Sequence, residues 1–193
     1  MKTIDIVAYK RTDLGKGSAR QLRKKALLPC VLYGGKSHLH LYMNMAEAND
    51  FIYTPEVFFI KVKVGEAHYT CIVKDLQFHP VNGFPLHVDL LQIFDDKSIQ
   101  MHIPIRSVGS SVGVAKGGAL LKKVRKISVF ALPKDIPAFI DVDVSGLDLG
   151  QTAKVKDVVA ANYVIQENLS MPLITIGIPR ALRSKVNEAT KAE

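Results

Sequence analysis

Two polar side chains in the run Leu86-His87-Val88-Asp89 could do chemistry together. His87 and Asp89 are two residues apart among β-forming residues, and this spacing places both on one face of a strand. Such a pair could work as an oriented general base, hydrogen-bond the base edges and ribose hydroxyls of RNA, or simply satisfy itself as a structural pair. The spacing of the residues identifies no nucleophile that would lie beside His87, so an enzyme that uses His87 and Asp89 is the less favoured alternative.

Metal and nucleotide chemistry have weaker support. His79 could join His87 and Asp89, but neither a Cys pair nor an H-x-x-x-H spacing accompanies them, and a zinc site needs three or four ligands. The stretch 15–18, Gly-Lys-Gly-Ser, lacks the spacing of a nucleotide-hydrolysing phosphate loop. It could hold a single nucleic-acid phosphate at a helix N-terminus, or be a plain capping turn. We predict no catalytic residue, no metal and no cofactor.

The charge is concentrated in one part of the chain. Lys and Arg number 26 against 18 Asp and Glu, a net charge of +8 over 193 residues. Residues 1–36 hold nine basic and two acidic residues, 9 − 2 = +7, whereas residues 37–95 hold three and seven, 3 − 7 = −4. A local excess of this size focuses a positive potential, and it favours nucleic acid as the partner over a merely solvated face.

Composition bounds the class of protein. With 48% hydrophobic and 23% charged residues, the chain resembles folded domains and not disordered, collagen-like or disulfide-rich ones. No apolar run approaches the roughly 20 residues of a membrane span, and Asp5 interrupts the apolar N-terminus, so we expect a cytoplasmic protein without a membrane partner. Cys30 and Cys71 stand alone in sequence and are expected to be small buried hydrophobic residues.

The elements that must position these residues are mostly strands. In the first half, alternation and turn residues predict six strands and two short helices, which favours a closed or nearly closed β-barrel. The strands are expected at residues 3–9, 30–33, 38–43, 57–64, 67–78 and 86–94. One helix is expected from Ser18, as its N-cap, to about Leu28 before Pro29, and the other at 44–53 with Asn44 as its N-cap.

The second half restarts the strand pattern after Asp95-Asp96-Lys97-Ser98. We therefore expect a barrel domain at 1–95, a C-terminal β domain at 96–179 and a mobile tail at 180–193. Strands are expected near 99–106, 126–132, 138–144 and 173–178, with a short helix near 156–160. Five basic residues and no acid occur between Lys116 and Lys126, and this cluster could touch RNA, touch a neighbouring protein or be solvated.

Several strings in this order resemble one known family, the bacterial 5S rRNA-binding ribosomal protein family twenty-five of the large subunit. The second half resembles its long form, the general stress protein CTC. The strings that carry the resemblance are Gly15-Lys16-Gly17-Ser18-Ala19-Arg20-Gln21-Leu22-Arg23, Pro29 through Tyr33-Gly34-Gly35-Lys36, Asp75-Leu76-Gln77-Phe78-His79-Pro80, Leu86-His87-Val88-Asp89, Gly113-Val114-Ala115-Lys116-Gly117-Gly118 and Asp135-Ile136-Pro137-Ala138-Phe139-Ile140-Asp141-Val142-Asp143-Val144-Ser145.

The resemblance implies a structural component of the large ribosomal subunit that binds the loop E region of 5S rRNA. It implies phosphate contacts from four cations: Arg11, Lys16, Arg20 and Arg23. It implies contacts with sugars and bases from Tyr33, Gln77, His87 and Asp89. Neighbouring ribosomal proteins are possible partners of the C-terminal domain, and a small-molecule substrate is not expected. A stress-related protein that binds RNA away from the ribosome is the alternative within binding proteins.

Overall fold

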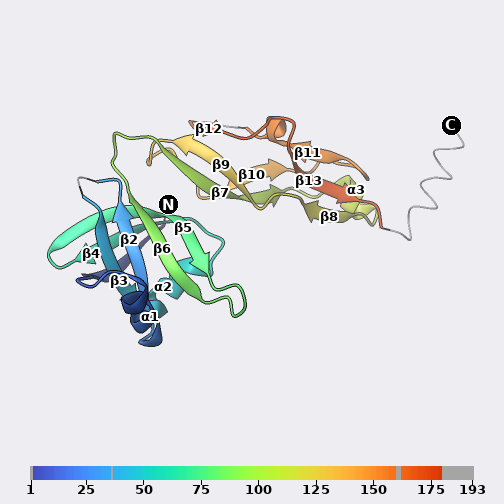
Figure 1. The fold of residues 1–193 in the computed structure, drawn as a ribbon. Coiled ribbons are helices and arrows are strands. Elements are labelled where there is room, and N and C mark those ends of the chain that lie inside the picture. The colour runs from blue at the N-terminus through green and yellow to red at the C-terminus, as the bar shows by residue number, and fades with distance from the viewer. Residues whose placement is uncertain (1, 36, 160–161, 180–193) are drawn as a thin grey trace, which may run out of the picture. The chain divides into compact units, whose positions relative to one another are not determined.

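The computed structural model describes residues 2–35, 37–159 and 162–179. The chain divides into two compact units, Met1–Met101 with Leu132–Ile136, and His102–Ala131 with Pro137–Glu193. The predicted class is confirmed: the fold is mainly β, with a six-stranded barrel and two short helices first and a β-rich region after them (Figure 1). The tail predicted at 180–193 lies outside the described residues. Within the described ranges, no helix is long and apolar enough to cross a membrane.

The N-terminal barrel is closed, with the strands in the order β1-β3-β2-β6-β5-β4. Parallel pairing of β1 with β4, from Lys2 opposite Phe58 to Ala8 opposite Val64, joins the two ends of the sheet. The elements are β1 (Lys2–Lys10), α1 (Lys16–Lys24), β2 (Leu27–Tyr33), β3 (Leu39–Asn44), α2 (Met45–Ile52), β4 (Phe58–Val64), β5 (Ala67–Phe78) and β6 (Pro85–Gln92). All six expected strands are present.

Alternating side chains fill the barrel. Leu41 and Met43 of β3 are fully buried, as are Val88 and Leu90 of β6, and the residues between them face outward. The helix α2 begins where it was predicted, because the Asn44 side chain accepts a hydrogen bond from the Ala46 N–H at 3.0 Å. Three apolar side chains of α2 join the same core: Ala48, Phe51 and Ile52.

The predicted helix from Ser18 to Leu28 is wrong at both ends. α1 begins after Gly15, and Ser18 does not cap it, because its hydroxyl donates to the Asp13 carbonyl at 2.8 Å. The helix ends at Lys24 because Ala26 adopts a left-handed conformation with φ 56°. Leu27 and Leu28 then enter β2, where Leu28 is fully buried in the barrel.

The C-terminal region forms two small sheets, in the orders β10-β7-β9-β12 and β11-β13-β8. Its elements are β7 (Ile99–Val108), α3 (Val112–Ala115), β8 (Ala119–Lys122), β9 (Lys126–Ala131), β10 (Ile140–Asp143), β11 (Thr152–Lys154), the 3-10 turn η1 (Val155–Asp157), β12 (Val164–Ile165) and β13 (Pro172–Gly177). The sequence predicted β7, β9, β10 and β13. The short helix expected near 156–160 overlaps the 3-10 turn at Val155–Asp157, and residue 160 lies outside the described residues. It missed α3, β8, β11 and β12, which have two to four residues each.

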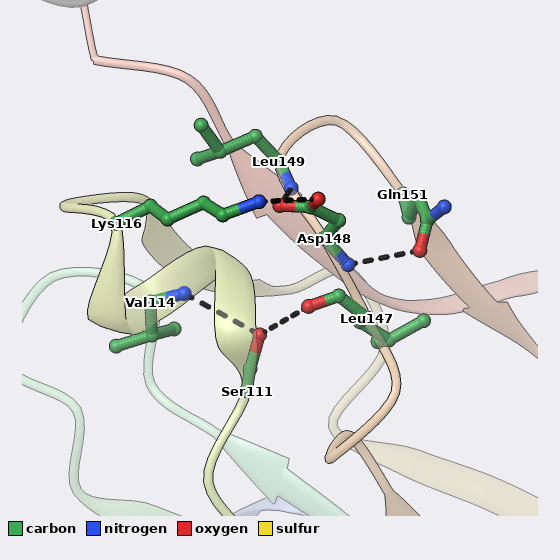
Figure 2. A network of polar contacts seen from close by, with 7 residues as sticks. All are labelled: Ser111, Val114, Lys116, Leu147, Asp148, Leu149 and Gln151. Atoms are coloured by element: carbon green, nitrogen blue, oxygen red, sulfur yellow. Dashed lines mark hydrogen bonds and ion pairs between the residues drawn. The ribbon is translucent and has the colours of Figure 1, made fainter.

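A tightly packed turn around α3 holds one end of this region together. The Ser111 hydroxyl donates to the Leu147 carbonyl at 2.7 Å and accepts from the Val114 N–H, while Lys116 forms an ion pair with Asp148 at 2.7 Å (Figure 2). The backbone passes so closely here that only glycine fits at two positions. A Cβ at Gly113 would lie 2.7 Å from the Asp148 carbonyl carbon, and one at Gly118 would lie 2.7 Å from the Gly113 carbonyl oxygen.

We therefore predict that Gly118→Ala destabilises the C-terminal unit by about 1–3 kcal/mol, because the added methyl group forces backbone and packed side chains apart. Urea unfolding followed by far-ultraviolet circular dichroism measures the change. Gly146→Ala is the matched control in the same unit, because a Cβ there meets no atom within 4 Å. Equal unfolding midpoints for the two variants would contradict the packing argument.

Candidate nucleic-acid interface

A strip of polar side chains crosses the outer face of the barrel on three neighbouring strands. In β6, Val88 and Leu90 point into the core, so His87 and Asp89 face outward. Leu76 of β5 and Cys30 and Leu32 of β2 also pack inward. The outward residues of these strands form the polar strip, which consists of Tyr33, Asp75, Gln77, His87 and Asp89.

The strand register brings these residues together. Gln77 of β5 lies directly opposite His87 of β6, and Asp75 lies opposite Asp89. On the other side of β6, Asp89 is paired with Val31 of β2, two residues before Tyr33. Residues that are far apart in sequence are therefore neighbours on one convex surface.

His87 and Asp89 contact each other directly. The His87 Nδ1 lies 2.7 Å from the Asp89 Oδ1, and the two side chains are 22% and 32% exposed. A carboxylate at this distance accepts a hydrogen bond from Nδ1–H, which orients the ring and leaves Nε2 as the free ring nitrogen. The pair can therefore offer a fixed imidazole nitrogen and carboxylate oxygens to a ligand on the surface.

Burial and the carboxylates of the polar strip raise the pKa of Tyr33. Partial burial raises the pKa of the Tyr33 phenol above its ordinary value, and the negative charges of Asp89 and Asp75 raise it further. The Tyr33 ring also lies beside the His38 ring, with centroids 6.4 Å apart. The phenol therefore stays protonated at neutral pH and can donate a hydrogen bond.

Asp75 and Asp89 form a like-charge pair across adjacent strands. Like charges directly opposite each other on adjacent strands are unfavourable, and the contact of His87 with Asp89 offsets part of that repulsion. Ligand groups that donate hydrogen bonds, such as ribose hydroxyls and exocyclic amines, relieve that repulsion. Sequence reasoning did not include Asp75 among the site residues, although its spacing of two from Gln77 could have placed it on the same face.

The helix α1 carries three of the predicted phosphate-binding cations. Lys16 and Arg20 are exposed on it, and α1 packs against β2. Arg23 is half-buried, and its Nε donates a hydrogen bond to the Leu86 carbonyl at 3.1 Å. Leu86 directly precedes His87 in β6. That bond fixes the end of α1 beside the polar strip and leaves the terminal guanidinium nitrogens of Arg23 for another partner.

Arg11 precedes α1 and is poorly satisfied within the chain. Its Nη2 has only long contacts, 3.4 Å to the Asp13 carbonyl and 3.5 Å to the Ser18 hydroxyl. Its buried Nε has no hydrogen-bond partner among the described residues. The long contacts of Nη2 leave hydrogen-bonding capacity at the end of this guanidinium, where a phosphate could accept.

The two cysteines lie in the core of the barrel. Cys30 and Cys71 are fully buried free thiols, as expected, and burial raises the pKa of each thiol to about 12. Among the residues that the structure describes, no group of three or more His, Cys, Asp and Glu side chains could hold a metal ion. The candidate site described above consists of cations on and before α1 and the adjoining polar strip on the barrel.

Comparison with known proteins decides the family. The Ribosomal L25p family matches residues 6–90, and the C-terminal domain of ribosomal protein TL5 matches residues 98–180. A protein of Amoebophilus asiaticus named large ribosomal subunit protein bL25 is 50% identical over 189 residues, which cover 98% of this chain and 96% of that protein. The chain belongs to the Ribosomal L25p family. Proteins of the L25p family are structural components of the ribosome and not enzymes.

Two further relatives carry the same name, large ribosomal subunit protein bL25. The protein of Cytophaga hutchinsonii is 41% identical over 191 residues, which cover 99% of this chain and all of that protein. The protein of Christiangramia forsetii is 40% identical over 169 residues, which cover 86% of this chain and 76% of that protein. The resemblance drawn from the sequence is thus confirmed over both halves of the chain, and an enzyme that uses His87 and Asp89 is ruled out.

We predict that Asp89→Asn lowers the pKa of the Tyr33 phenol toward its ordinary value. Ionisation of Tyr33 places a phenolate beside Asp89, and removal of the carboxylate charge makes that ionisation easier. Titration of the Tyr33 ring by carbon-13 nuclear magnetic resonance measures the shift. Asp50→Asn, at an exposed position on α2, is the control and should leave Tyr33 unchanged. An unchanged Tyr33 pKa in Asp89→Asn would separate the phenol from the carboxylates.

Proposed function

We propose that the chain binds 5S rRNA at its loop E region, as a component of the large ribosomal subunit in the cytoplasm. Residues 1–95 form the RNA-binding domain in this proposal, and residues 96–179 form the second domain. The observation that carries it is the position of the His87–Asp89 pair, on the convex outer face of a closed barrel beside a cationic helix. Membership of the Ribosomal L25p family and the names of the relatives support it.

The two parts of the site have different tasks in this proposal. Cations supply affinity and orientation by binding phosphates, which carry no sequence information. These cations are Arg11, Lys16, Arg20 and Arg23. The polar strip supplies specificity, because its side chains donate to or accept from sugars and base edges. The residues of the strip with this task are Tyr33, Gln77, His87 and Asp89. Asp75 joins them in this proposal, because it lies opposite Asp89.

The carboxylates explain why an irregular RNA loop is the favoured target. Asp75 and Asp89 repel phosphates, so they suit a ligand that presents hydroxyl and amino donors to the strip. An ordinary A-form helix hides its base edges in a deep, narrow major groove. An internal loop with non-standard pairs exposes such edges, and the cations at α1 can hold the flanking phosphates.

A titration tests the proposal directly. The full chain is titrated against a labelled 5S rRNA fragment that contains loop E, and against a plain RNA duplex of equal length, at several salt concentrations. Tighter binding to the loop E fragment at every salt concentration supports the proposal. Equal affinity for both RNAs would reduce the site to a general polyanion surface and overturn the assignment of loop E.

We predict that Arg20→Ala weakens binding to the loop E fragment and lowers the salt slope by about 0.7–0.9 in log-log units, the contribution of one phosphate contact. Filter binding between 50 and 200 mM salt measures the slope. Lys63→Ala removes an exposed cation from β4, away from α1 in the strand order, and should leave the slope unchanged. A slope equal to that of the original protein in Arg20→Ala would remove Arg20 from the phosphate contacts.

We predict a different signature for the polar strip. His87→Ala and Asp89→Ala should each weaken binding by about 1–3 kcal/mol with little change in salt slope, because polar contacts to sugars and bases release few counterions. The double variant should lose less than the sum of the two, since the side chains act as one hydrogen-bonded pair. Unchanged affinity in both single variants would make the pair a structural feature of the barrel.

A further inference from the structure

A second cationic surface lies in the C-terminal unit, at the turn between β8 and β9. The five basic residues from Lys116 to Lys126 are not equivalent in the structure. Lys116 forms an ion pair with Asp148, with its Nζ 2.7 Å from Oδ2 (Figure 2). The other four cations are exposed, and none of them forms an ion pair with another residue of the described ranges. They define the basic turn, which consists of Lys122, Lys123, Arg125 and Lys126.

The backbone of the basic turn is anchored on both sides. The Lys123 N–H donates to the Leu173 carbonyl at 2.8 Å, and the Arg125 carbonyl accepts from the Ile105 N–H at 3.0 Å. Lys122 ends β8 in one sheet, and Lys126 begins β9 in the other. Four positive charges within five residues are therefore presented by a fixed backbone, which reduces the ordering cost when a ligand binds.

The composition of the basic turn selects the class of partner. Protein interfaces depend on buried aromatic or aliphatic anchors, and the turn offers only Val124, which is half-buried. Its charged side chains only donate hydrogen bonds, and phosphate oxygens are the acceptors that a nucleic-acid helix presents along its whole backbone. Exposed, unpaired cations suit the phosphates of a nucleic-acid backbone, which bind by charge and release counterions.

We propose that the basic turn is a second RNA-binding surface, which binds the phosphate backbone of an RNA helix without regard to sequence. It lies in a different compact unit from the polar strip. The chain would thus bind two RNA segments at once, one by specific contacts and one by charge. The proposal goes beyond binding of loop E and does not depend on it, because the two surfaces share no residue.

The test measures recruitment of a second RNA. The full chain is first mixed with one equivalent of the unlabelled loop E fragment, so that no free unlabelled RNA competes for the basic turn, and a labelled 20-base-pair RNA duplex is then titrated into it by fluorescence anisotropy. The variant Lys123→Glu/Arg125→Glu reverses two charges of the basic turn. The control Lys61→Glu/Lys63→Glu makes the same charge change at two exposed positions of β4. Thermal unfolding of each variant confirms that it is folded, and the neutral pair Lys123→Gln/Arg125→Gln replaces a variant that is not.

The expected result is a ternary complex with the original protein and with the β4 control. In the variant at the basic turn, duplex binding near 100 mM salt should fall about tenfold or more, and the log-log salt slope should fall by about 1.4–1.8, the value of two phosphate contacts. Equal duplex binding by all proteins, or none by the original protein, would overturn the proposal. Failure of the loop E site is seen separately, as loss of preference for the loop E fragment in the first titration.

Discussion

Closure of the six-stranded barrel is the constraint on which the candidate interface depends. Parallel pairing of β1 with β4 joins the sheet to itself, so each strand has one face in a single core and the other on a convex surface. A shift of one residue in β6 would send His87 and Asp89 into the core and expose Val88 and Leu90. Burial of the apolar residues therefore fixes which strand positions face outward, and this placement does not depend on the contact between His87 and Asp89.

The interface combines groups that the free protein satisfies poorly. Asp75 and Asp89 face each other as like charges, and the Nε of Arg11 is buried without a hydrogen-bond partner among the described residues. In the proposed function, hydroxyl and amino donors of the RNA face these carboxylates, and phosphates meet the terminal nitrogens of the Arg11 guanidinium and not its buried Nε.

The sequence predicts the barrel well because its signal is local. Alternation along a strand, turn residues between strands and a helix cap such as Asn44 are all properties of residues that are close in sequence. These local signals located all six strands and α2. The end of α1 was misplaced because Ala26 adopts a conformation that alanine rarely adopts. The spacing of two from Gln77 was enough to place Asp75 on the outer face of β5. Its position opposite Asp89 was not predictable, because it depends on a register irregularity between Val73 and Asp75 that local pattern does not reveal.

The poor intrinsic stability of α1 has a thermodynamic consequence. This helix has no fully buried residue, no side-chain cap and no acid in its first turn, where Lys16 instead opposes the helix dipole. Its attachment rests on packing against β2 and on the bond from Arg23 to Leu86. Segments of this kind open locally at a small fraction of the global unfolding free energy. In the proposed function, neutralisation of its cations by phosphates would favour the folded helix, and ordering of α1 would then contribute to the heat and entropy of RNA binding.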